Sequence, residues 1–135
     1  MKRKSIFILI FFLFNGIAFS QNWIYVGSAT NGNKYYLRNN NTSETGYKKV
    51  WSKTVGKSFQ YKKNGKTYTL LNGYSIDLHE YDCSGRQVKL LSYVYYNSKG
   101  TPVHSVTLQS YETEWWDVIP DSIGEMLLDK VCELF

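Results

Sequence analysis

The stretch WWDVIPDS, residues 115–122, decides how this chain can fold. It leads into Ser-Ile-Gly-Glu, residues 122–125, which fits a capping box: the serine hydroxyl and the glutamate carboxylate satisfy free backbone N–H groups at a helix start. After it, apolar side chains recur on one helical face and acidic ones on the other: Ile123, Leu127, Val131 and Leu134 against Glu125, Asp129 and Glu133. The sequence predicts one C-terminal helix lying on a sheet. A helix of about two or three turns does not persist alone in water, so packing and a covalent tie have to hold it.

The mature chain ahead of this helix reads as β-strands and turns. Residues 22–29 and 34–38 are rich in β-branched and aromatic side chains and flank Asn31-Gly32-Asn33, so they predict a hairpin. Residues 86–96 carry apolar side chains on both faces and predict a central strand, to which residues 101–110 return antiparallel. The expected fold class is α+β, an antiparallel sheet with one C-terminal helix packed on it.

Two segments allow different structures. Residues 47–55 alternate without a clearly dry face, which predicts a strand near an edge of the sheet. Residues 58–62 and 67–71 flank Asn64-Gly65 and form either a second, lysine-rich hairpin or a mobile excursion. The sequence does not determine the face on which residues 55–73 fold.

Residues 74–82 alternate between an apolar and a more polar face: Tyr74, Ile76 and Leu78 on the first, Ser75, Asp77, His79 and Tyr81 on the second. Cys83 continues the second set. If the helix packs on the apolar face, a disulfide from Cys83 to the helix requires either a bulge near Glu80 or a strand that has ended by Asp82. The sequence leaves both alternatives open.

Cys83 and Cys132 are the two cysteines of the chain. An exported protein is expected to pair them because its compartment is oxidising, and closing this loop contributes about 4 kcal/mol to stability. The alternatives are an intermolecular bridge or a metal site that would also draw on His79 and His104. The spacing of these residues is irregular for a metal site. We therefore expect an intramolecular disulfide, no metal and no cofactor.

Residues 1–20 have the three parts of a secretory signal peptide: a basic start, an apolar run over residues 6–14, and small residues before a cut after Ser20. The alternative, a membrane anchor, needs about 20 predominantly apolar residues, and Asn15-Gly16 interrupt the run. We expect removal of residues 1–20 and export of a single mature domain, residues 21–135. No cysteine lies near the cut, so no lipid anchor is expected. No transmembrane segment is expected in the mature chain either.

Charge is distributed unevenly along the mature chain. Residues 45–76 contain no acidic residue, whereas residues 112–133 carry acidic side chains against Lys130 alone. A basic segment with interleaved aromatic rings is typical of a surface that binds a protein or a polyanion; alternatively, the lysines blunt exposed strand edges. The candidate binding residues are Lys48, Lys49, Trp51, Lys53, Lys57, Tyr61, Lys62, Lys63, Lys66 and Tyr68.

The sequence contains little that resembles catalytic machinery. Ser75, Asp77 and His79 supply the residue types of a hydrolytic triad, but same-face residues of a strand are about 7 Å apart. They predict a solvent-facing or partly covered polar stripe. His104 is a lone histidine, and no paired-carboxylate spacing, Gly-rich phosphate loop or Cys-His nucleophile motif occurs. We expect no enzyme.

An ordered set of motifs spans almost the whole mature chain. Its members are Trp23 to Gly27, Lys34-Tyr35-Tyr36, Val50-Trp51, Tyr81-Asp82-Cys83 with Arg86, Trp115 to Pro120 with Ser122 and Glu125, and Val131-Cys132. In this set the chain resembles the surface-adhesin protein E family of small exported bacterial proteins. The resemblance implies an antiparallel sheet of about six strands whose concave side holds a C-terminal helix through a disulfide. It also implies adhesion to host epithelium and to matrix or plasma proteins such as vitronectin and laminin.

The leading hypothesis is an exported, non-enzymatic, adhesin-like binding protein that uses the lysine-rich and aromatic strand surface from Tyr47 to Tyr68. The alternative is a periplasmic binding module or inhibitor that acts on another bacterial or invading protein. Nucleic acid is not an expected partner. The sequence leaves open the identity of the ligand, a homodimer, and the choice between periplasm, secretion and cell surface.

Overall fold

The computed structural model describes residues 22–40 and 45–135. The predicted signal peptide, residues 1–20, lies outside this described part of the chain. Within it, no helix combines the length and the apolar character that crossing a membrane requires.

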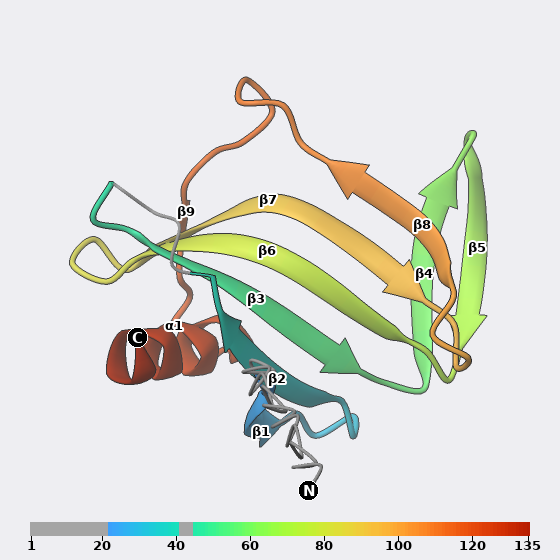
Figure 1. The fold of residues 1–135 in the computed structure, drawn as a ribbon, viewed down its shortest axis with the longest axis horizontal. Coiled ribbons are helices and arrows are strands. Elements are labelled where there is room, and N and C mark those ends of the chain that lie inside the picture. Colours follow the sequence, from blue (N-terminus) through green and yellow to red (C-terminus); the bar gives the residue numbers. More distant parts are fainter. Residues whose placement is uncertain (1–21, 41–44) are drawn as a thin grey trace, which may run out of the picture.

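Six antiparallel strands form the main sheet in the order β1-β2-β3-β6-β7-β8 (Figure 1). Their bounds are β1 Ile24–Ser28, β2 Lys34–Asn39, β3 Lys48–Val55, β6 Tyr74–Asp82, β7 Gln87–Tyr96 and β8 Pro102–Thr107. A short strand, β9 Trp116–Asp117, pairs with the start of β7. Together with the C-terminal helix α1, Ile123–Leu134, this architecture confirms the predicted α+β fold class.

Most strand predictions are confirmed, but the one for β3 is wrong. β1 and β2 form the expected hairpin, and β7 lies between β6 and β8 as its apolar residues on both faces predict. β3 is no edge strand, because it lies between β2 and β6. Its sequence shows no clearly apolar face because the buried side carries both Val50 and the polar Ser52. On the other side, Lys49 and Lys53 lie over polar and aromatic side chains.

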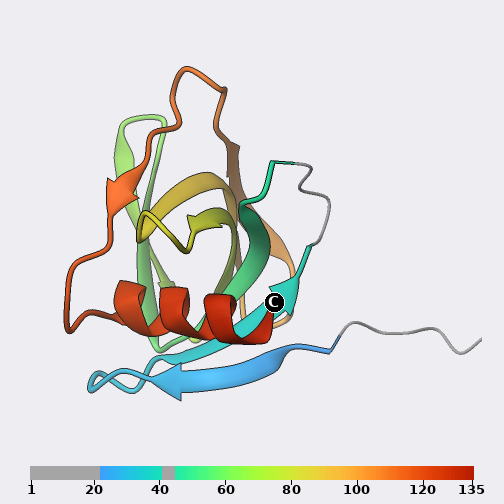
Figure 2. The ribbon, with the colours of Figure 1, turned by 90° about the vertical axis from the view of Figure 1, so that its left-hand side faces the viewer.

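Two further strands, β4 Ser58–Lys63 and β5 Lys66–Leu71, form a separate two-stranded sheet. Asn64 and Gly65 both have positive φ, 51° and 72°, as a tight two-residue hairpin turn requires. Of the two alternatives for this segment, the hairpin is therefore correct. It stands at the end of the main sheet away from α1 (Figures 1 and 2).

The hydrophobic core joins α1 to one face of the main sheet, which we call the inner face. Leu37, Val50 and Tyr81, from three neighbouring strands, pack against Leu128 and Val131 of the helix. None of these five side chains is more than 2% exposed. The core therefore lies under the helix, at one end of the curved sheet (Figure 2).

The helix packs on the Ser75–Tyr81 side of β6, so the premise that it lies on the apolar Tyr74 side is wrong. It covers only the end of β6 at Tyr81, and the polar residues of the same face lie farther along the strand. β6 ends at Asp82, and Cys83 bonds to Cys132 with the Cα atoms 5.9 Å apart. Pairing of β6 with β3 is regular, whereas its pairing with β7 shifts register between Leu78 and His79. The predicted disulfide is confirmed. Because the helix packs on the Tyr81 face, which Cys83 continues, the disulfide requires neither a bulge near Glu80 nor an early strand end.

The start of α1 agrees with the capping prediction, while its buried stripe differs. The backbone N–H of Glu125 donates to Ser122 Oγ at 3.2 Å, and the Glu125 carboxylate accepts from the backbone N–H of Asp121 at 2.8 Å. The buried helix residues are Leu128 and Val131, whereas Leu134, predicted to face the sheet, is 42% exposed. The stripe is rotated relative to the predicted one, because Leu127 and Phe135, and not Leu134, pack beside Leu128 and Val131 against the core.

Candidate functional site

The predicted binding residues do not form one surface. On β3, Lys49, Trp51 and Lys53 point to the outer face, opposite α1, whereas Lys48 lies on the inner face and its Nζ donates to the Phe135 carbonyl oxygen at 2.8 Å. The remaining residues lie on or beside the β4–β5 hairpin: Lys57, Tyr61, Lys62, Lys63, Lys66 and Tyr68. The sequence run from residue 47 to residue 68 is thereby divided among three places.

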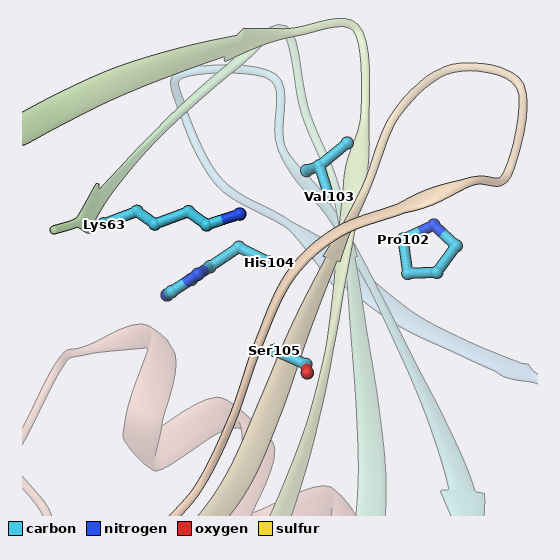
Figure 3. Close-up of a pocket in the computed structure, with 5 residues that line it drawn as sticks. All are labelled: Lys63, Pro102, Val103, His104 and Ser105. Carbon is cyan, nitrogen blue, oxygen red and sulfur yellow. The ribbon is translucent and has the colours of Figure 1, made fainter.

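The lysines of the hairpin are exposed. Lys57, Lys62, Lys63 and Lys66 take part in no salt bridge within the described residues, whereas Lys49 lies 3.7 Å from Glu80. Lys63 extends from the hairpin toward β8, where it lines a surface hollow of about 370 Å³ together with residues 102–105 (Figure 3).

The hairpin contacts the main sheet through aromatic rings. The Tyr61 ring stacks on His104 of β8 and on Tyr95 of β7, with centroid separations of 5.0 and 5.7 Å. Phe59 also contacts Tyr95, and Tyr68 stacks on the side of Tyr61 within the hairpin. These rings anchor the hairpin and leave its lysines directed to solvent.

The outer face carries cation–aromatic contacts that the sequence did not reveal. The Arg38 guanidinium lies 4.6 Å from the Trp23 ring centroid, and Lys53 Nζ lies 4.5 Å from that of Tyr74. Lys89 lies 4.6 Å from the Trp115 ring. Each pair joins different strands or loops, so strand register, and not local spacing, brings the partners together. Lys53 is therefore already engaged within the protein.

A polar cluster occupies the middle of the inner face, between α1 and the hairpin. Strand register places Ser52 of β3 and Tyr93 of β7 on either side of Asp77. Ser75 Oγ donates to the Asp77 carboxylate at 3.5 Å, and Ser52 Oγ lies 3.3 Å from His79 Nδ1. His79 thus contacts the serine of another strand, and Ser75, Asp77 and His79 do not assemble as a triad. The sequence predicted that this polar stripe is either solvent-facing or partly covered, and it is partly covered.

Burial controls the ionisation of this cluster. Desolvation raises the pKa of Asp77 from 3.8 to about 7, while the hydrogen bond from Ser75 acts weakly in the opposite direction. Desolvation lowers the pKa of His79 to about 4, so the imidazole is neutral at neutral pH. Burial, followed by the nearby Asp77 charge, raises the pKa of Tyr81 and of Tyr95. The cluster therefore resists carrying charge of either sign.

Asp77→Asn is expected to raise the free energy of unfolding near pH 8 and to leave it almost unchanged near pH 4. Because the folded-state pKa is raised, the stability linked to Asp77 is fully present below 3.8 and is lost as the pH rises through about 7. The slope is at most about 1.4 kcal/mol per pH unit. Urea unfolding of both proteins across this range measures it.

The titration of His79 should cancel in that comparison. The lowered pKa of His79 gives stability that is present above 6.5 and is lost as the pH falls through about 4, and this contribution is common to both proteins. The difference between the two unfolding curves therefore isolates Asp77. A difference that does not change with pH would show that the Asp77 carboxyl titrates at its ordinary value.

The described residues contain no group of three or more histidine, cysteine, aspartate or glutamate side chains placed to hold a metal ion.

The fold and its surfaces define a class: a small antiparallel-sheet domain with one disulfide-bonded helix, an exposed basic hairpin and a polar cluster on its inner face. Residues 23–133 match the family described as surface-adhesin protein E, and the chain belongs to that family. Comparison with curated proteins and with solved structures found no match.

Proposed function

We propose that the protein is an exported, non-enzymatic binding protein of the adhesin type, and that the β4–β5 hairpin is its ligand-binding element. Membership of the surface-adhesin protein E family supports an adhesin-like surface protein. We choose the hairpin because its lysines differ from those of β3 in what they contact. The candidates on β3 contact other parts of the protein, whereas those of the hairpin, Lys57, Lys62, Lys63 and Lys66, are exposed and lack salt bridges within the described chain.

The ligand is a protein or polysaccharide surface that presents negative charge. Lysines at the free end of a hairpin attract such a surface without first breaking ion pairs, so their desolvation is the main electrostatic cost of binding. Tyr68 is 41% exposed and stacks on Tyr61, which is itself fixed against the sheet. An immobilised ring next to lysines offers contact area at a small entropic cost. Extracellular matrix proteins and heparin-like polymers have the required chemistry.

Replacing Lys62, Lys63 and Lys66 by alanine in residues 21–135 is expected to weaken binding to immobilised heparin at least about tenfold, or about 1.4 kcal/mol. The matched control replaces Lys89, Lys99 and Lys130 by alanine, which removes the same charge from residues that line neither the surface hollow at Lys57 nor the one at Lys63, and is expected to bind nearly as well as wild type. Surface plasmon resonance at low and physiological salt measures both, because screening weakens exposed charge contacts. An equal loss in both variants, or no wild-type binding at low salt, would contradict the proposal.

Cell fractionation separates this proposal from a periplasmic module or inhibitor. An adhesin has to reach the cell surface or the medium, whereas a protein recovered only from the periplasm cannot meet host tissue. Protease accessibility on intact cells gives the same distinction independently. Recovery in the periplasm alone would reject the adhesin function and favour the alternative.

A further inference from the structure

A cleft of about 200 Å³ opens on the inner face, between the helix-covered core and the hairpin. It is lined by Asp77, His79, Leu90, Tyr93 and Tyr95, from β6 and β7. None of these is among the lysines and aromatic residues assigned above to the basic hairpin. The cleft is smaller than the roughly 300–1,000 Å³ of pockets for drug-sized ligands, so a ligand here has a body of about one ring or less.

Two small, buried polar residues lie next to Asp77 on the inner face. Ser52 and Ser75 are 3% and 5% exposed, and they lie beside Asp77 across the strand and along it. The wall of the cleft on the β7 side is aromatic, because Tyr93 is the direct cross-strand neighbour of Asp77.

The carboxylate of Asp77 is largely desolvated and has no cationic partner among the described residues. It takes part in no salt bridge there, and the hydrogen bond from Ser75 is long at 3.5 Å. The titratable groups around it are His79 on its own strand, Tyr81 farther along the same face, and Tyr93 and Tyr95 on β7. A buried carboxylate is normally paired with a positive group or neutralised. A cation placed beside the Asp77 carboxylate would stabilise its charged form.

The tyrosines supply the second requirement for a cation. A positively charged nitrogen over the face of an aromatic ring is attracted by the ring quadrupole, and this attraction grows as the site excludes water. Tyr93 and Tyr95 meet edge to face, with centroids 5.7 Å apart, so their ring planes differ in direction and wall the cleft from two angles. Leu90 provides an apolar contact for the body of the ligand.

We propose that this cleft binds a small organic cation, an ammonium group on a body of at most one ring, with the nitrogen at the Asp77 carboxylate and against the Tyr93 and Tyr95 rings. The neutral imidazole of His79 also lines the cleft, with its Nδ1 held 3.3 Å from Ser52 Oγ. This site and the basic hairpin select ligands of opposite charge. They adjoin each other, because the Tyr95 ring that walls the cleft also stacks on Tyr61 of the hairpin.

Benzylamine is the probe and benzyl alcohol its uncharged analogue, both titrated near pH 8 into ¹⁵N-labelled protein, residues 21–135. Benzylamine is expected to shift the amide resonances of residues 75–79 and 90–95 in a saturable way, and benzyl alcohol is expected to bind at least about tenfold more weakly. Near pH 5.5 the affinity for benzylamine should fall, because the probe stays cationic while Asp77 becomes protonated.

Two variants complete the test. Asp77→Asn keeps the shape of the side chain and is expected to lose at least tenfold in benzylamine affinity while remaining folded. The Lys62, Lys63 and Lys66 alanine variant should bind benzylamine as the wild type does, which separates a failure of this site from a failure of the hairpin. Equal binding of amine and alcohol, unchanged affinity in Asp77→Asn, tighter binding of a neutral methyl glycoside, or no saturable shift at millimolar benzylamine would each overturn the proposal.

Discussion

Replacing Cys83 and Cys132 by serine is expected to lower the free energy of unfolding by about 4 kcal/mol. The disulfide joins residues 49 positions apart, and it ties a short helix to the end of β6. Without it the unfolded chain gains the entropy of an open loop, while the folded state keeps only the contacts of one helix face. Urea unfolding followed by far-ultraviolet circular dichroism measures the change.

Chemical reduction provides the control for that substitution. A reductant should move the unfolding curve of the wild type close to that of the double serine variant and should leave the variant itself unchanged. A loss below about 1 kcal/mol would mean that the helix is held mainly by packing, since native strain or structure in the unfolded chain can remove the expected gain.

Leu128→Ala is expected to reduce the free energy of unfolding by about 2–5 kcal/mol. Leu128 is fully buried between Leu37, Val50, Tyr81 and Val131, so the truncation leaves a cavity that four neighbours from three strands and the helix cannot easily close. The loss should appear in the disulfide-bonded protein, because the covalent tie does not replace the missing contacts. Thermal and urea unfolding measure it.

Leu134→Ala is the matched comparison for this prediction. The same chemical change is made at the last residue of the helix, at a side chain that is 42% exposed and has lost less contact with water. We expect a loss of less than about 1 kcal/mol there. Similar losses at both positions would mean that Leu134 faces the sheet, as the periodicity of the sequence had predicted for that residue.

The helix start and the disulfide could be predicted because their signals are local. The capping serine and the carboxylate that follows it lie within one turn, and two cysteines allow one intramolecular pairing. The central position of β7 also follows from its own residues, since apolar side chains on both faces require neighbours on both sides.

The position of β3 and the members of the polar cluster could not be predicted in the same way. β3 contains a core residue, Val50, and a cluster residue, Ser52, on one face, so its pattern resembles that of a half-exposed strand. The partner of His79 is Ser52, which lies 27 positions earlier in the chain. Only the register between β3 and β6 brings them together, and hydrophobic alternation alone does not fix that register.

The binding residues could not be located from the charge pattern for the same reason. A run of lysines shows how much positive charge a segment carries, but it does not show to which face of the sheet each lysine points. Alternation sends Lys48 and Lys49 to opposite faces of β3. The hairpin collects the lysines that remain in solvent because both of its strands lie outside the main sheet.

The separate pairing of β4 with β5 has a consequence for how this scaffold can diversify. The hairpin shares no strand ladder with the main sheet, and it joins the sheet near Gly56 and Gly73, where a side chain at Gly73 would collide with the Tyr96 carbonyl oxygen. The residues at its tip, beyond the contacts of Phe59 and Tyr61 with the main sheet, can therefore change without moving the register of any sheet strand. The ligand preference of this fold can therefore change through substitutions at the hairpin tip, while the main sheet and the disulfide-bonded helix keep their structure.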